Sequence, residues 1–213
     1  MAIAAERLAE WVRPEHTALV MNECQQGVVG AESSLPDLAA AAQLGMIPRL
    51  AALTEAARAA GATVIHGVAM RRPDGKGANT NARLFGFAAK SPVQLTPGTS
   101  AVEVVPEIGV DESDLVVARL HGLSPFQGTE LDSLLRNLGI RTVIATGVSI
   151  NVAVTNLAFD AVNAGYQVVI PRDCVASTPP EYAEAVFAHT LGVVATLVES
   201  NELIEAWKPL AKT

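Results

Sequence analysis

The strongest constraint on the fold is an alternation along the chain of short, β-branched apolar runs with longer stretches whose apolar residues recur at helical spacing. Such runs are typical of strands, and apolar residues three and four positions apart are typical of helices. Runs that are apolar at every position, rather than at every second one, indicate strands buried on both faces of a parallel sheet. Six strands are expected, at residues 17–23, 63–68, 115–119, 142–146, 167–170 and 193–198.

Stretches with helical spacing connect several of these strands. Four helices are expected, at residues 47–60, 131–138, about 151–165 and about 180–191. Gly61 and Gly139 follow the first two helices, in the position where glycine commonly ends a helix. Parallel strands joined by crossover helices form a sheet that is covered on both faces. The pattern therefore predicts an α/β protein, a three-layer α/β/α sandwich around a doubly wound, mainly parallel sheet of about six strands.

Length and charge narrow the class further. A chain of 213 residues, half of them hydrophobic, is long enough to bury one core, so we expect a single domain over residues 1–213. Only 17% of the residues are charged, the net charge is −7, and no basic cluster occurs beyond Arg71 and Arg72. Such a chain is a poor match for nucleic acid or for an anionic membrane surface, and we expect neither as a partner.

Cysteine usage and the first residues of the sequence indicate a compartment. Cys24 and Cys174 are too few for a disulfide framework, which favours a reducing environment. Charges at Glu6, Arg7 and Glu10 interrupt the region in which a signal peptide would be apolar. We therefore expect a cytoplasmic protein.

The longest stretch without a regular pattern covers residues 70–99. Long loops beside a sheet edge often line a pocket or a partner surface, and this one either does so or is inert surface. The sequence contains neither the glycine-rich dinucleotide fingerprint nor a phosphate-binding loop motif. We therefore expect no cofactor.

Three stretches carry a family pattern: TALVMNECQQ at residues 17–26, SPFQGTEL at 124–131 and GIRTVIATGVSINVAV at 139–154. Their order, spacing and positions at expected strand ends resemble those of the isochorismatase-like hydrolases, also called the cysteine hydrolase superfamily. The resemblance extends over about residues 17–198. It implies the same three-layer fold, a small-molecule ligand or substrate, and assembly as a homo-oligomer, either a dimer or a tetramer.

The catalytic positions of that family are changed in this chain. Members that hydrolyse amides, such as nicotinamidases, use an Asp at the end of the first strand, a Lys before a Ser-Ala-Phe-like turn, and a Cys that opens a helix. By resemblance these positions hold Glu23, Leu120 and Ala153, so the triad is degenerate. The Asp-x-His by which nicotinamidases bind a metal is absent from the sequence, and the four histidines lack metal-ligand spacing. We expect no metal.

Glu23 is the first catalytic candidate, because a carboxylate that ends an apolar strand is costly to bury unless it is paired. Arg119 and His121, on either side of Leu120, are the other two. Arg119 keeps its charge and would bind an anion, whereas His121 would also transfer protons. The alternative for both is structural: an arginine that pairs with Glu23 or another acid, and a histidine in a solvent-exposed loop.

A second set of residues is expected to contact a substrate. Gln25 shares the strand face of Glu23. The resemblance places a non-proline cis peptide between Val148 and Ser149, at a turn whose following helix would direct backbone N–H groups at an oxyanion. Asn151 either caps that helix or contacts the ligand. The full set is Gln25, Ser124, Phe126, Val148, Ser149, Asn151 and Ala153.

Two functions follow from these residues. The first is hydrolysis of a small molecule without a cysteine nucleophile. True isochorismatases of this family also lack the cysteine and protonate a vinyl ether from the strand-end carboxylic acid, a role that would belong to Glu23. The alternative is a catalytically silent homologue that binds a small molecule or serves as a scaffold. Cys24 alternates away from Glu23 and is expected in the core, with a displaced nucleophile as the other interpretation.

Overall fold

The computed structural model describes residues 3–208, which include one parallel sheet. Its strands are β1 (Thr17–Asn22), β2 (Thr63–Ala69), β3 (Leu115–Arg119), β4 (Thr142–Val148), β5 (Gln167–Pro171), β6 (Val175–Ala176) and β7 (Thr196–Val198). The strand order is β3-β2-β1-β4-β5-β7, and the short β6 pairs with β4. All pairings between these strands are parallel. The two central strands, β1 and β4, are buried along their whole length, as their continuous apolar sequences require.

Helices connect the strands. The α-helices are α1 (Ala5–Trp11), α2 (Gln26–Val29), α3 (Pro36–Ala41), α4 (Ile47–Ala60), α5 (Arg83–Lys90), α6 (Leu131–Asn137), α7 (Thr155–Asn163), α8 (Glu181–His189) and α9 (Ser200–Trp207). Two π-helical segments, η2 (Ala42–Met46) and η4 (Ile150–Val154), lead directly into α4 and α7. Short 3₁₀ turns occur at η1 (Pro14–His16), η3 (Ser100–Val102), η5 (Arg172–Cys174) and η6 (Leu191–Val193).

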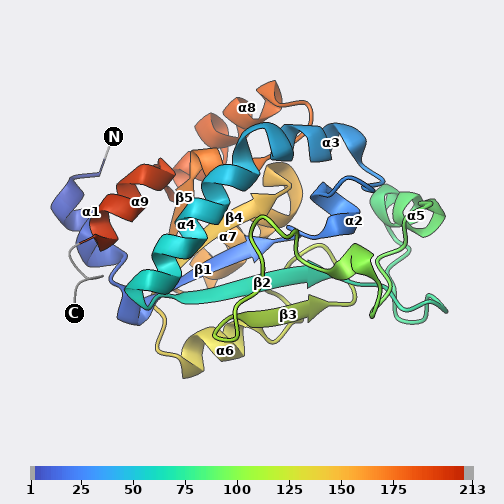
Figure 1. Ribbon diagram of the computed structural model, residues 1–213, viewed down its shortest axis with the longest axis horizontal. Helices are drawn as coiled ribbons and strands as arrows, with labels where there is room; N and C mark the ends of the chain where they lie inside the picture. The colour runs from blue at the N-terminus through green and yellow to red at the C-terminus, as the bar shows by residue number, and fades with distance from the viewer. Residues whose placement is uncertain (1–2, 209–213) are drawn as a thin grey trace.

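A hydrophobic core lies on each face of the sheet, so the molecule has three layers (Figure 1). On one face α1, α4 and α9 pack around Leu50, Leu53 and Trp207. On the other face α6, α7 and α8 pack around Leu135 and Leu157. These five side chains are almost completely buried. The two cores together hold the sheet rigidly enough to present the residues that follow its strands.

The predicted α/β class and the mainly parallel sheet with helices on both faces are confirmed. The strand expected at residues 193–198 is wrong at its start, because residues 191–193 form η6 and the strand begins at Thr196. Val193 is 76% exposed there, so its apolar side chain does not belong to the sheet. Strand β6 was not expected, since two residues are too few to show a period.

The expectation that residues 70–99 are irregular is wrong in part, because this segment contains α5. The sequence of α5 is amphipathic, but no residue of the helix is buried and none belongs to either core. Figure 1 shows α5 beyond the arrowheads of β2 and β3, at the carboxyl edge of the sheet. Among residues 3–208, no helix combines the length and apolar character needed to cross a membrane.

Candidate ligand-binding site at the carboxyl edge of the sheet

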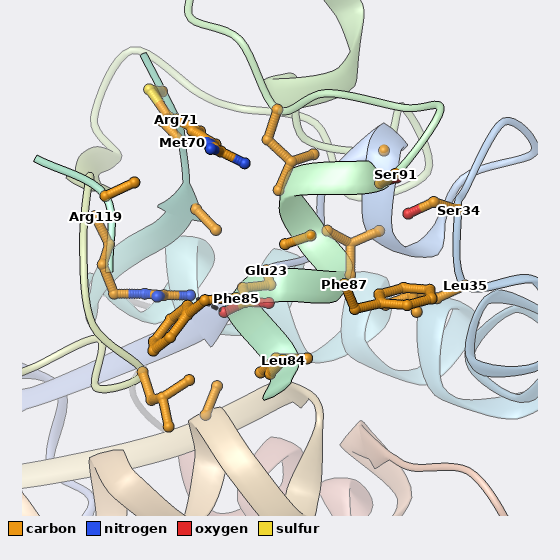
Figure 2. Close-up of a pocket in the computed structure, with 18 of the residues that line it drawn as sticks. Glu23, Ser34, Leu35, Met70, Arg71, Leu84, Phe85, Phe87, Ser91 and Arg119 are labelled. Atoms are coloured by element: carbon orange, nitrogen blue, oxygen red, sulfur yellow. Dashed lines mark hydrogen bonds and ion pairs between the residues drawn. The ribbon is translucent and has the colours of Figure 1, made fainter. Parts of the chain in front are cut away.

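A cavity of about 240 Å³ opens at the carboxyl ends of β1, β2 and β3 (Figure 2). Residues that follow β1, β3 and β4 form its base, and the segment 70–99, with α5, forms its outer wall. Apolar side chains predominate in the lining, among them Met70, Leu84, Phe85, Phe87, Leu95 and Leu120. Parallel α/β sheets commonly bind ligands at this edge, so the cavity is the candidate site.

Glu23 lies at the base of the cavity, one residue after β1. Its backbone takes the left-handed conformation, with φ of 53°, and its N–H donates to the carbonyl oxygen of Gly67 at 2.8 Å. This turn ends the strand and directs the side chain into the cavity. The Glu23 carboxylate accepts a hydrogen bond from the guanidinium of Arg119 in a close ion pair. The expectation of a polar partner for Glu23 is therefore confirmed.

Arg119 is the last residue of β3, and hydrogen bonds hold both its backbone and its side chain in place. Its carbonyl oxygen accepts the N–H of Met70 at 2.9 Å, which extends the pairing of β2 with β3. Its guanidinium also donates to the carbonyl oxygen of Gly122. The Arg119 and Glu23 side chains are 12% and 21% exposed, so the pair is partly desolvated and open to the cavity.

Three other predicted residues line the same cavity: Leu120, His121 and Ala153. Leu120 is 47% exposed and His121 is exposed as well. The His121 ring lies against Gly128, where an added Cβ would come within 2.9 Å of the ring. Ala153, on η4, is buried and presents its methyl group. The structure thus brings together all three catalytic candidates and the two other family triad positions.

Gln25 does not line the cavity and is completely buried. Its side-chain amide donates to the carbonyl oxygen of Ala69 at 2.9 Å and accepts the N–H of the same residue at 2.7 Å. A third, longer bond runs to the carbonyl oxygen of Ala101. Gln25 therefore fastens the end of β2 to the segment after β1, which fixes where residue 70 and its successors begin.

Ser124 and Phe126 also lie outside the cavity lining. The Ser124 hydroxyl donates to Asp160 of α7 and accepts the N–H groups of Phe126 and Gln127, at 3.0 and 2.9 Å. Phe126 is buried in the core beside α6 and α7 and packs edge-on against Tyr166. Both residues shape the turn after β3, and neither faces the candidate ligand space.

Four substrate-contacting residues were predicted in and around the turn between β4 and η4. Of these, Ser149 and Ala153 line the cavity, and Val148 and Asn151 do not. The peptide between Val148 and Ser149 is cis, as the family resemblance implies, and Val148 is buried. Asn151 is exposed and makes no capping hydrogen bond. The N–H groups of Val152 and Val154 donate to the Ser149 carbonyl, so these two donors are already used.

Gly147 explains how this turn approaches β1. Its φ is 92°, and a Cβ at this position would lie 2.2 Å from the carbonyl oxygen of Asn22. A side chain cannot fit in that space, and only glycine adopts this backbone conformation at little cost. The residue therefore allows η4, and with it Ala153, to start directly beside the end of β1.

Neither cysteine of the chain reaches the cavity. Both are buried in the core on the α4 face. Burial, and secondarily the charge of Glu23, raises the pKa of Cys24 to about 12. Burial and the neighbouring Asp173 also raise the pKa of Cys174. Both thiols are therefore protonated at neutral pH. Cys24 is a core residue, as expected, but strand alternation is not the cause, because β1 ends at Asn22 and Glu23 is in the left-handed conformation.

Residues of the segment 70–99 line the cavity, which is the first of the two alternatives that the sequence left open for this segment, but the sequence does not show that Arg71, Leu84, Phe85 and Phe87 are among the lining residues. The pair of arginines at 71 and 72 was visible, but nothing in the sequence showed that only the first one lines the cavity. Figure 2 shows Phe85 and Phe87 on opposite sides of α5, with Phe87 beside Leu35. Within residues 3–208, no group of three or more His, Cys, Asp or Glu side chains is arranged to hold a metal ion.

Comparisons with known proteins agree on one family. A family model described as the isochorismatase domain matches residues 17–202. The uncharacterized isochorismatase family protein YwoC of Bacillus subtilis is 32% identical over 106 residues, which are 50% of this chain and 56% of YwoC. Ureidoacrylate amidohydrolase RutB of Enterobacter is 28% identical over 184 residues, 80% of each chain. The chain thus matches little more than half the length of the first of these relatives.

Solved structures lead to the same fold. The crystal structure of an isochorismatase family protein from Desulfovibrio vulgaris superposes with a TM-score of 0.76 at 26% sequence identity. The match covers 89% of this chain and 96% of that protein. Agreement over this share of both chains supports the three-layer fold.

Proposed function

The chain belongs to the isochorismatase family of hydrolase-like folds, and we propose that it binds a small molecule in the cavity beside Glu23 without forming a covalent intermediate. One observation carries this proposal. The largely apolar cavity at the carboxyl edge of the sheet contains the Arg119–Glu23 pair and the methyl group of Ala153, but no thiol. Cavities with an apolar lining and a few polar groups are typical small-molecule sites.

The lack of a nucleophile supports binding over amide hydrolysis. A cysteine hydrolase needs a thiolate in contact with its substrate. By the family pattern that position is Ala153, whose methyl group lines the cavity. Cys24 and Cys174 are buried elsewhere, with pKa values raised by that burial. No acyl-enzyme is therefore expected with amide substrates.

Hydrolysis with Glu23 as the general acid is the second candidate. It is favoured by the position of the carboxylate, which lines the cavity where a substrate would lie. A general acid must carry a proton in the reacting complex. The contact with the Arg119 guanidinium favours the charged carboxylate over the protonated acid that this role requires. Binding is therefore the better supported function.

The two candidates are separated by a panel of small amides, ureas, esters and vinyl ethers, each assayed for turnover and for a rise in melting temperature. We expect a rise without turnover, because a ligand that binds only the native state stabilises it. Thiol alkylation should leave the result unchanged. Turnover that Glu23→Gln abolishes would establish acid catalysis, and turnover that Cys24→Ser abolishes would overturn the binding proposal.

A matched pair of α5 variants locates the binding. Ala88 and Ala89 are both exposed, but only Ala88 lines the cavity. Ala88→Trp should therefore remove the ligand-induced rise in melting temperature, and Ala89→Trp should keep it. Equal effects of the two substitutions would show that the ligand binds elsewhere.

Assembly as a dimer or tetramer, the cytoplasmic location and the single-domain organisation stay predictions. Leu44 and Val193 expose apolar side chains, at 88% and 76%, that an interface between subunits would cover.

A further inference from the structure

The charges that line the cavity do not balance. The fully charged side chains in the lining are Glu23, Arg71 and Arg119, with His121 beside them. Glu23 and Arg119 neutralise each other in their ion pair. Arg71 therefore leaves one positive charge facing a largely apolar space, and an apolar cavity with an uncompensated cation favours an anionic ligand.

Arg71 differs from its neighbour Arg72 in its partners. Arg72 is exposed and donates two hydrogen bonds to Asp74, both at 3.0 Å. Within the part of the chain that the structure describes, no carboxylate lies within 4.0 Å of the Arg71 guanidinium. Asp74, the acidic residue closest to Arg71 in the sequence, is already paired with Arg72. The two adjacent arginines form a natural pair of test and control positions.

The backbone holds Arg71 at the rim of the cavity before a ligand arrives. Its N–H donates to the carbonyl oxygen of Leu95 at 2.8 Å, and the preceding N–H, of Met70, donates to Arg119. The Arg71 guanidinium lies beside Gly75, where an added Cβ would come within 3.1 Å of it. Figure 2 shows the nitrogen-bearing end of Arg71 on the same side of α5 as Arg119. Ordering of the loop therefore costs little on binding.

The apolar lining limits the rest of the ligand. The lining includes Leu84, Phe85 and Phe87 of α5, together with Leu35 and Leu95, around a space of about 240 Å³. An apolar cavity of about 150 Å³ is enough to hold benzene, so this cavity has room for one ring or a branched chain with a charged group attached. Aromatic walls add favourable ring contacts. The body of the ligand is therefore compact and apolar.

The charge of the ligand follows from the same geometry. A planar guanidinium binds the two oxygens of a carboxylate through parallel hydrogen bonds. A second negative charge on the ligand would meet a base at which the charge of Arg119 is already neutralised by Glu23. A single anionic group is therefore favoured over a phosphate dianion or a dicarboxylate.

Resting on the proposed binding function, we propose that the ligand is a small monocarboxylate with a compact apolar body, and that Arg71 binds its carboxylate. The apolar body lies against α5 and Leu120. Arg71 is a specificity determinant in this arrangement, because it distinguishes an acid from a neutral molecule of the same shape. Glu23 and Arg119 lie at the far end of the ligand, away from its charge.

The test compares benzoate with benzamide, which has nearly the same shape but no charge, by isothermal titration calorimetry on the wild-type protein and on Arg71→Gln, Arg71→Lys and Arg72→Gln. In the wild type we expect benzoate to bind at least about tenfold more tightly than benzamide, as a charge-assisted hydrogen bond contributes. Arg71→Gln should abolish this preference, Arg71→Lys should restore part of it, and Arg72→Gln should leave it unchanged.

The outcomes separate this inference from the function on which it rests. If benzoate and benzamide bind equally to the wild type, and Ala88→Trp removes both, the cavity binds small molecules but the carboxylate assignment is wrong. If Arg71→Gln and Arg72→Gln reduce the preference for benzoate equally, the preference arises from the general positive charge of the region. That result would also overturn the assignment of the carboxylate to Arg71. Binding of inorganic phosphate but not benzoate would assign the site to another anion. Absence of binding by either probe, with other panel members still raising the melting temperature, would refute the carboxylate class alone.

Discussion

Strand β3 has an arginine–carboxylate contact at each end, and the two contacts have opposite surroundings. The side chain of Asp114, directly before the strand, is inaccessible to solvent and pairs with Arg58 of α4, whose side chain is 21% exposed. Arg119, the last residue of the strand, pairs with Glu23 at the base of the cavity, where both side chains remain partly exposed. The same pair of chemical groups thus stabilises the packing of the fold at one end of the strand and borders the cavity at the other.

The buried contact is saturated with hydrogen bonds. The Asp114 carboxylate accepts hydrogen bonds from Nε and Nη2 of Arg58, at 3.2 and 2.5 Å. It also accepts from Nε2 of His66 at 2.8 Å and from the backbone N–H of Asp111 at 3.0 Å. Burial acts to raise the pKa of Asp114, but these hydrogen bonds outweigh it and hold that pKa below its usual value. The Arg58 guanidinium also donates to the carbonyl oxygens of Ile108 and Gly109.

The cavity contact has few partners by comparison. Glu23 accepts from Arg119, and Arg119 donates in addition to one carbonyl oxygen, that of Gly122. Carboxylate oxygens and guanidinium N–H groups have capacity for more bonds than these. The two contacts therefore differ in how much of their hydrogen-bonding capacity the protein itself uses, and the contact at the cavity leaves part of it facing the cavity.

Removal of the buried carboxylate is expected to have the largest effect. Asp114→Ala leaves Arg58 charged and partly buried and leaves His66 without its partner, which should lower the free energy of unfolding by about 3–5 kcal/mol. Urea denaturation measures the loss.

Glu112→Gln, an exposed substitution in the same loop, is the control and should change stability by about 0.5 kcal/mol or less. A loss below about 1 kcal/mol for Asp114→Ala would contradict the contrast between the two contacts. If Asp114→Ala does not fold, Asp114→Asn, which keeps part of the hydrogen bonding, should show a smaller loss.

The pH dependence of stability sharpens the comparison, because only the buried contact includes a histidine. Burial lowers the pKa of His66, and the hydrogen bond and charge of Asp114 only partly oppose it. The unfolded chain therefore takes up a proton near pH 6.5 while the native state does not, so stability is full above that pH and falls below it. The slope should reach up to about 1.4 kcal/mol per pH unit.

Urea denaturation of the wild type and of His66→Gln, between about pH 5 and about pH 7.5, isolates this contribution. The difference in stability between the two proteins should shrink as the pH falls through this range, and the slopes of the two curves should differ. Parallel curves would mean that His66 has the same proton affinity in both states, and that the buried contact contributes nothing to acid sensitivity.

Loss of the cavity contact is expected to have the smallest effect on stability. Glu23→Gln keeps the size of the side chain and removes the charge, and Arg119 retains access to solvent through the cavity. The free energy of unfolding should fall by about 1 kcal/mol or less, as for other solvent-accessible ion pairs. A loss as large as that of Asp114→Ala in the same urea titration would show that the cavity contact also holds the fold together.

The sequence predicts the sheet better than the segments around it, for a physical reason. A strand buried on both faces, such as residues 142–146, needs apolar residues throughout, and that need is visible in the sequence. The helix at Arg83–Lys90 buries no side chain, so no core imposes a pattern on it. The turn at residues 191–193 has strand-like composition but an exposed valine, and only tertiary packing decides its conformation.

The candidate site was predictable where it depends on strand ends. Glu23 and Arg119 each terminate an apolar run, and parallel strands bring such ends together. Gln25 shows the limit of this reasoning, because a polar residue at a strand end also serves to satisfy backbone groups, which is what it does. Arg71 was not identifiable as a cavity residue, since the direction of its side chain depends on the path of a loop rather than on a period.

The absence of buried side chains in α5 has a consequence for how the cavity opens. A segment that buries little apolar surface separates from the protein at a small fraction of the free energy needed for global unfolding. Helix α5 is such a segment, whereas Glu23 follows the central strand β1, and Arg119 ends β3, an edge strand that pairs with β2 over five residues. Local opening of this one helix therefore lets a ligand enter and leave, while the hydrogen bonds of the sheet keep the groups at the base of the cavity in place.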